Sequence, residues 1–159
     1  MLFRSGTIEK VYSEQTGNVE NLDSKIDRYF RMLRLPDSEI QVTHLMNKDS
    51  LEMTDADRDV IVRNCQQCAD SCIVITHGTD TMVETAAALA RAVPGKTIVL
   101  TGAMIPYAFG SSDGLFNLGS ALSLVQVLSP GIYIAMNGRH FEWNKVRKNR
   151  ETGVFEAVS

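Results

Sequence analysis

The chain has 159 residues and a net charge of −3, and 44% of its residues are hydrophobic while 22% are charged. This balance predicts one globular domain with an adequate core, and the slight acidity leaves no basic footprint for nucleic acid. No apolar run approaches the roughly 20 residues of a membrane span, and residues 1–6 lack the apolar core of a signal peptide, so we expect a cytoplasmic location.

The first predicted elements are a helix, a strand and a second helix. A short amphipathic helix is predicted at 27–35, after a polar, turn-prone stretch at 13–24. Alternating apolar and polar residues predict a strand at 40–45. Apolar residues at helical spacing, with acidic residues near the start, predict a helix at 54–68.

The most informative segment runs from Ile73 to Met82, where a β-branched stretch ends in His-Gly-Thr-Asp-Thr. Such a run predicts a strand buried on both faces, and open α/β sheets bind ligands beyond the carboxyl ends of such strands. The Ala-rich segment 81–92 predicts a helix with Asp80 or Thr81 as candidate cap. We therefore expect Thr79 and Asp80 beside a helix N-terminus that favours an anion.

The second half of the chain alternates strands with helices. Strands are predicted at 97–101 and 132–136, a helix at 114–128 with Asp113 as its N-cap, and hairpin turns at 137–138 and 152–153. This order predicts an α/β fold with a mostly parallel sheet and helices on both faces, a flavodoxin-like three-layer arrangement. Segments 76–80 and 101–104 would then share one sheet edge.

Three cysteines, Cys65, Cys68 and Cys72, lie close together, and the first two have the C-x2-C spacing of zinc and redox sites. No second pair accompanies them, and the three histidines are scattered. We interpret them as partly buried helix cysteines and predict neither a metal site nor an organic cofactor.

Taken in order, Gly6-Thr7-Ile8, the segment 77–82, Lys96 and Thr-Gly-Ala-Met at 101–104 resemble the bacterial-type L-asparaginase family, amidohydrolases with a threonine nucleophile. The resemblance covers nearly the whole chain and corresponds to the N-terminal domain of those enzymes. We therefore expect residues 1–159 to form one such domain, without the family's C-terminal domain. Similarity to short-chain asparaginases implies a homo-oligomer, either a dimer or a tetramer.

The resemblance implies a role for each matching residue. Thr7 would be the nucleophile and Tyr12 its activator, while Thr79 would pair with Lys96 and Asp80. Ser50 would bind the α-carboxylate of the substrate, and Asp80 would also hold its α-amino group. The expected catalytic residues are thus Thr7, Tyr12, Thr79, Asp80 and Lys96, and the expected substrate-binding residues are Asp49, Ser50, Gly78 and Asp80.

An amide carbonyl is a poor electrophile, so its hydrolysis profits from an activated hydroxyl and from donors aimed at the oxyanion. The expected reaction is L-asparagine plus water giving L-aspartate and ammonia, with possible minor glutaminase activity. Acylation of Thr7 would release ammonia and leave a β-aspartyl ester that water cleaves. Whether Lys96 acts as a base or as a fixed positive charge stays open at this point.

Two other functions remain open from the sequence. One is an amidase subunit that supplies ammonia to a partner amidotransferase. The other is a non-catalytic amino-acid-binding or assembly module, which is favoured by Leu51, where the family often has Gln. We interpret His77 as structural, and the basic tail residues Lys145, Arg147, Lys148 and Arg150 as a solvated hairpin or a subunit contact.

The family begins with an apolar strand, whereas here only Met-Leu-Phe-Arg-Ser precedes Gly6. We therefore expect a truncated first strand that leaves backbone groups of its neighbours unpaired. Because Leu-Phe-Arg-Ser is also encoded by one reading frame of a common sequencing-adapter end, we hypothesise that residues 1–5 are not native.

Overall fold

The computed structural model describes residues 1–4, 10–12, 19–21, 30, 35, 40–105 and 111–158. Within these ranges, no helix is both long and apolar enough to cross a membrane.

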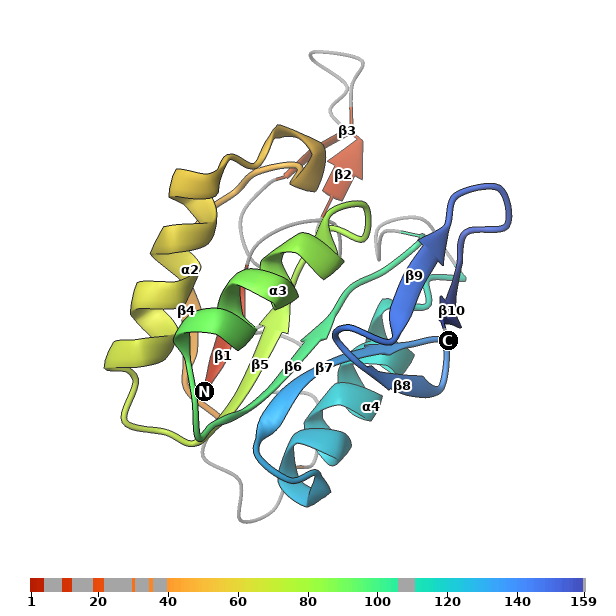
Figure 1. The fold of residues 1–159 in the computed structure, drawn as a ribbon. Coiled ribbons are helices and arrows are strands. Elements are labelled where there is room, and N and C mark those ends of the chain that lie inside the picture. The colour runs from red at the N-terminus through yellow and green to blue at the C-terminus, as the bar shows by residue number, and fades with distance from the viewer. Residues whose placement is uncertain are drawn as a thin grey trace.

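Six strands form the main sheet, in the order β4-β1-β5-β6-β7-β8 (Figure 1). Their bounds are Leu2–Arg4 for β1, Val42–His44 for β4, Cys72–Thr76 for β5, Thr97–Thr101 for β6, Gly131–Met136 for β7 and Arg139–Glu142 for β8. The first five strands in this order are parallel, and β8 runs antiparallel to β7. The mostly parallel sheet that the alternation of elements predicts is confirmed.

Strand β1 is short but lies inside the sheet. It pairs with β4 on one side and β5 on the other, and both Leu2 and Phe3 are buried. Arg4 is in register with His44 and with Thr76. The expectation of neighbouring strands left unpaired is therefore wrong for these residues, because three residues suffice to fill the place between β4 and β5.

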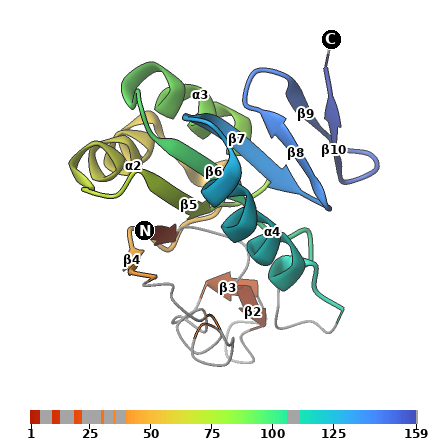
Figure 2. The same cartoon turned by 90° about the horizontal axis from the view of Figure 1, so that it is seen from below.

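Helices cover both faces of the sheet, as Figure 2 shows. The helices α2 (Asp55–Gln67) and α3 (Met82–Ala92) lie on one face, and α4 (Gly114–Val127) lies on the other. The core on the α2 and α3 side contains Ile75, Leu89 and Phe155, and the core under α4 contains Val99 and Leu118. The predicted three-layer arrangement is confirmed.

Tight turns shape the end of the chain. The residues between β7 and β8, Asn137 and Gly138, have φ of 54° and 76°, as a two-residue hairpin of the primed type requires. A second hairpin joins β9 (Val146–Asn149) to β10 (Val154–Ala157), with Gly153 at a φ of 70°. Both predicted turn positions are confirmed.

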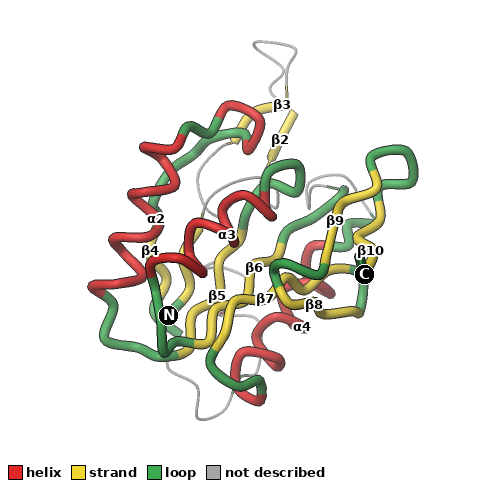
Figure 3. Tube along the Cα trace, viewed as in Figure 1, coloured by secondary structure: helices red, strands yellow, loops and turns green. Residues whose placement is uncertain are grey.

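The beginning of the chain contains a further antiparallel pair, β2 (Lys10–Tyr12) and β3 (Val19–Asn21), shown as strands in Figure 3. The sequence does not predict this pair, because β3 falls in a stretch whose polar residues indicate turns. The helix predicted at 27–35 lies outside the described residues except at positions 30 and 35.

Asp113 and Asn117 tie the loop after β6 to α4. Asp113 stands at the N-cap position of α4, as predicted, but its side chain makes no cap bond, because its carboxylate accepts hydrogen bonds from the backbone N–H groups of Met104 and Ile105. The amide of Asn117 donates to the same carboxylate at 2.8 Å and to the carbonyl of Gly102 at 3.0 Å. Two polar side chains therefore satisfy the backbone of a strand-end loop.

Replacing Asn117 should destabilise the fold markedly. Its side chain is fully buried, and its carbonyl also accepts from the N–H of Asn137 at 2.9 Å. Asn117→Ala leaves these groups unpaired, so we expect the free energy of unfolding to fall by about 3 kcal/mol. Ser123→Ala, an exposed position on the same helix, should change it by less than about 0.5 kcal/mol. Urea denaturation of both variants checks this, and equal effects would contradict it.

Candidate functional site

The candidate site lies at the carboxyl ends of β5 and β6. The register pairs Thr76 with Thr101, so both strands end at the same level. Segment 77–81 follows β5 and leads into α3. On strand β9, the ammonium of Lys148 donates to Thr79 Oγ1 and to Asp80 Oδ1, each at 2.8 Å. A single lysine therefore joins the last hairpin of the chain to the end of a central strand.

These three side chains are largely shielded from water. Thr79 is 5% exposed, the Lys148 side chain 11% and that of Asp80 33%. Charge-assisted hydrogen bonds are stronger than neutral ones, and partial burial reduces the screening of the ion pair. The geometry fixes the Thr79 hydroxyl, because its oxygen accepts from a cation that the neighbouring carboxylate holds in place.

The expected pairing of Thr79 with Lys96 is wrong. Lys96 precedes β6, and its ammonium donates to the carbonyl of Cys68. The five-residue rise from Lys96 to Thr101 corresponds to roughly 16 Å along an extended strand. Lys96 consequently lies at the amino edge of the sheet, opposite to the site.

The sequence pattern places Lys148 in a solvated tail and so misses its role. One signal is present, because alternate residues of a strand share a face and Val146, two positions before Lys148, is apolar. In the structure Val146 is buried, and Lys148 lies opposite the buried Phe155 in the β9–β10 ladder. The face of the hairpin that packs onto the core is the face that carries the lysine.

The 3-10 turn η2 (Ser50–Glu52) also lies beside the segment that carries Thr79 and Asp80. The hydroxyl of Thr81 donates to the carbonyl of the buried Ser50 at 2.7 Å. Thr81 stands at the N-cap position of α3 but makes no side-chain cap bond, so the capping that the sequence predicts is not found. Asp49 instead caps η2, its carboxylate accepting from the N–H of Leu51 at 2.9 Å.

Gly78 allows this turn to lie close to the segment after β5. A Cβ atom at Gly78 would stand 2.5 Å from Ser50 Oγ and 2.6 Å from Ser50 Cβ, closer than atoms tolerate. Glycine is therefore required by close approach. The contact places the Ser50 hydroxyl directly beside the backbone that carries Thr79 and Asp80.

His77 is fully buried beneath the site. Its Nδ1 lies 2.7 Å from the carbonyl of Gly78, and its Nε2 lies 2.9 Å from Thr85 Oγ1 on α3. The pKa of His77 is lowered from its usual 6.5 to about 4, chiefly by burial and in smaller part by the positive charge of Arg58, while the bond to Gly78 opposes the shift. The ring is neutral at pH 7.

The structure brings together Asp49, Ser50, Gly78, Thr79 and Asp80 of the predicted site residues and adds Lys148 to them. Thr7 lies outside the described residues, so its place is untested. Tyr12 ends β2, and its side chain also lies outside the described part of the chain. Arg4, the last residue of β1, is in register with Thr76, so the chain leaves β1 at the edge where β5 ends.

Among the described residues, no three histidine, cysteine or acidic side chains gather in a way that would hold a metal ion. The cysteines near α2 differ in exposure, Cys65 being buried and Cys72 exposed. Burial raises the pKa of the Cys65 thiol to about 12, so this side chain behaves as a small apolar residue.

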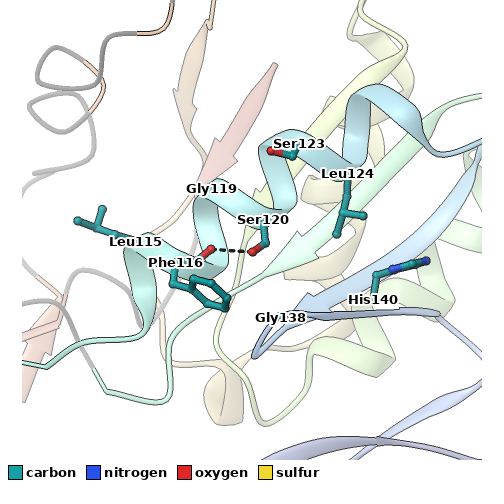
Figure 4. A pocket seen from close by; sticks show the side chains of 8 residues that line it. All are labelled: Leu115, Phe116, Gly119, Ser120, Ser123, Leu124, Gly138 and His140. Carbon is teal, nitrogen blue, oxygen red and sulfur yellow. Dashed lines mark hydrogen bonds between the residues drawn. The ribbon is translucent and has the colours of Figure 1, made fainter.

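A separate groove of about 610 Å³ lies between α4 and the β7–β8 turn (Figure 4). Its lining comprises Leu115, Phe116, Gly119, Ser120, Ser123, Leu124, Gly138 and His140. The Ser120 hydroxyl bonds to the carbonyl of Phe116 within its own helix. The groove includes none of the residues around Lys148 and offers no pair of acid and base, so we do not place the candidate site there.

The comparisons with known proteins agree on one protein family. The family model described as Asparaginase, N-terminal matches residues 1–158. The chain is 34% identical to an L-asparaginase of Thermococcus kodakarensis over 128 residues, covering 77% of this chain and 39% of the relative. It is 32% identical to L-asparaginase 1 of Escherichia coli over 168 residues, covering 99% and 48%.

Solved structures agree with this result. The structure of the thermostable L-asparaginase from Thermococcus kodakarensis superposes with a TM-score of 0.86 at 30% identity, covering 99% of this chain and 50% of that one. Part of the chain, 67 residues, is also 45% identical to a subunit of the glutamyl-tRNA(Gln) amidotransferase from Methanococcus vannielii, covering 42% of this chain and 16% of that protein. The chain spans at most about half the length of these relatives.

The neutral, buried His77 should make stability depend on pH. Above pH 6.5 neither the folded nor the unfolded ring is charged, whereas below it the unfolded ring binds a proton that the folded ring refuses until about pH 4. Relative to His77→Gln, the wild type should therefore lose about 3 kcal/mol of unfolding free energy between pH 7 and pH 4. Denaturant titrations across this range measure the difference, and a constant difference would disprove the assignment.

Proposed function

The chain belongs to the asparaginase family through the N-terminal domain, and from this premise we propose that it hydrolyses L-asparagine to L-aspartate and ammonia, with L-glutamine as a minor substrate. The observation that carries the proposal is the position of Lys148 between Thr79 and Asp80 at a parallel-sheet edge. Such edges are where open α/β sheets bind their ligands.

The hydrogen bonds of this group support a defined role for Thr79. An ammonium only donates, so the hydroxyl oxygen of Thr79 accepts from Lys148. The single hydroxyl proton of Thr79 is consequently directed to another acceptor, such as the carbonyl oxygen or the leaving nitrogen of an amide. Because Asp80 balances its charge, Lys148 serves in this arrangement as a fixed cation and not as a base, the alternative role that the sequence leaves open for Lys96.

We assign the nucleophilic step to Thr7, as the family resemblance implies, with Tyr12 as its activator. The Thr7 oxygen would bond to the amide carbon, the carbon–nitrogen bond would break, and the nitrogen would leave as ammonia after taking up the proton that the Thr7 hydroxyl gives up. Water would then cleave the β-aspartyl ester, which returns the Thr7 hydroxyl and releases aspartate. Thr79 would donate to the oxygen or nitrogen that gains charge in these steps.

Substrate binding is proposed for the residues around Gly78 and Asp80. Ser50 contributes a hydroxyl beside Gly78, and the N-terminus of α3 directs backbone N–H groups to the same region, which suits a carboxylate. Asp80, one-third exposed, supplies negative charge for an α-amino group. In this proposal Asp49 acts indirectly, because it holds the turn that carries Ser50.

The partial match to an amidotransferase subunit favours a second candidate, an amidase subunit that delivers ammonia to a partner enzyme. The chemistry at Thr79 would be the same in both cases. The two functions differ in whether ammonia is released without the partner, which the assay below distinguishes.

Ammonia release from L-asparagine and L-glutamine is the test, with Lys148→Met and Lys96→Met as a matched pair. Lys148→Met removes the cation that orients Thr79, so we expect kcat/KM to fall by about 100-fold or more. Lys96→Met should keep most of the activity, because Lys96 lies at the opposite edge. Circular dichroism of each variant confirms that it is folded.

Thr79→Val completes this series by removing the hydroxyl while keeping its shape. We expect a loss similar to that of Lys148→Met. Retained activity in Lys148→Met together with loss in Lys96→Met would overturn the assignment. A folded parent that releases no ammonia would favour the partner-dependent amidase or a binding module.

We also propose that the protein is a cytoplasmic homo-oligomer, a dimer or a tetramer, following the family resemblance. A structure from Campylobacter jejuni that this chain resembles is described as a probable cytoplasmic L-asparaginase. Light scattering after size exclusion should give two or four times the chain mass of 17.6 kDa. A fully active monomer would contradict this expectation.

A further inference from the structure

His77 makes two hydrogen bonds that the reaction proposed above does not use. The imidazole has no exposed surface, so it can reach neither substrate nor solvent. One ring nitrogen contacts the carbonyl of Gly78, directly before Thr79, and the other contacts the hydroxyl of Thr85 on α3. The ring thus links a helix to the peptide group that leads into the site.

The chemistry of these partners assigns the tautomer. A carbonyl oxygen only accepts hydrogen bonds, so Nδ1 of His77 must carry a proton. In a neutral ring Nε2 is then an acceptor, and the Thr85 hydroxyl must donate to it. The opposite tautomer would place two acceptors 2.7 Å apart inside the protein.

We propose that His77, held in this tautomer by Thr85, is a positioning residue that fixes the Gly78–Thr79 peptide and thereby aligns the Thr79 hydroxyl with Lys148. The inference rests on the proposed function for its catalytic consequence. Its structural part, the tautomer and the fixed peptide, stands independently of which reaction the site performs.

The glycine at position 78 explains why the hydrogen bond from His77 is needed. Close approach of Ser50 excludes any side chain there, and glycine leaves the backbone more freedom than any other residue. The bond from His77 to its carbonyl removes that freedom at the peptide group before Thr79. Because the C=O and N–H of a trans peptide point in opposite directions, fixing the Gly78 carbonyl also fixes the N–H of Thr79.

The backbone of Thr79 is then fixed, and its side-chain oxygen accepts a hydrogen bond from the ammonium of Lys148 at 2.8 Å. A rotated peptide would move the Thr79 Cβ and lengthen this bond. Misplacement of a reacting group by about 1 Å can cost about 100-fold in rate, so a buried hydrogen bond beside the site has a catalytic consequence.

Nuclear magnetic resonance of the ring nitrogens tests the structural part in the wild-type protein. Long-range proton–nitrogen correlations at pH 7 should show His77 with Nδ1 protonated and Nε2 unprotonated. Thr85→Val should shift the backbone amide signal of Thr79, whereas Thr85→Ser, which keeps the hydroxyl, should leave it in place. The reverse tautomer, or a Thr79 signal that Thr85→Val does not move, would overturn the proposal.

Steady-state kinetics of the same pair tests the catalytic part. Thr85→Val should lower kcat by about tenfold to 100-fold with little change in KM, and Thr85→Ser should restore it. Equal kcat values in folded Thr85→Val and wild type would refute the positioning role. If the wild type releases no ammonia, the proposed function fails while the resonance experiment still judges the placement of the peptide.

Discussion

The ion pair between Lys148 and Asp80 is the interaction on which the candidate site depends. It joins residues 68 positions apart in the chain, and the same ammonium holds the Thr79 hydroxyl. Removing water from a lysine is costly unless its donors find partners. Here the ammonium of Lys148 donates to a carboxylate and to a hydroxyl. The packing of the β9–β10 hairpin onto the sheet therefore also completes the candidate site.

The opposite side of the same segment is held by neutral groups. Thr81 secures η2 through the carbonyl of Ser50, and His77 secures the carbonyl of Gly78. A charged imidazole in this position would lack solvation, and burial keeps it neutral. The segment after β5 therefore has hydrogen bonds to the hairpin, to α3 and to the turn before α2, and these bonds leave the Thr79 hydroxyl little freedom.

Local patterns predict the main sheet and helices well. The patterns that predict these elements are β-branched runs, an acidic first turn and paired turn residues, and each depends on only a few neighbouring positions. The observed bounds of α2, β5 and β6 agree closely with the predicted ones. The site is predictable only in part. Thr79 and Asp80 directly follow their strand, whereas Lys148 lies 68 positions after Asp80 in the sequence. Strand polarity would have excluded Lys96, since a residue before a parallel strand lies at the other edge.

The direction of the parallel strands also explains how the short strand β1 supports the candidate site. β1 contributes only residues 2–4, yet it lies between β4 and β5 and ends level with Thr76. Because the strands are parallel, β1 ends at Arg4 on the edge of the sheet where Thr79, Asp80 and Lys148 meet. Thr7 is three residues further along the sequence. The register of β1, and not the length of the strand, therefore sets the edge of the sheet at which β1 ends, and the proposed role of Thr7 is consistent with that edge.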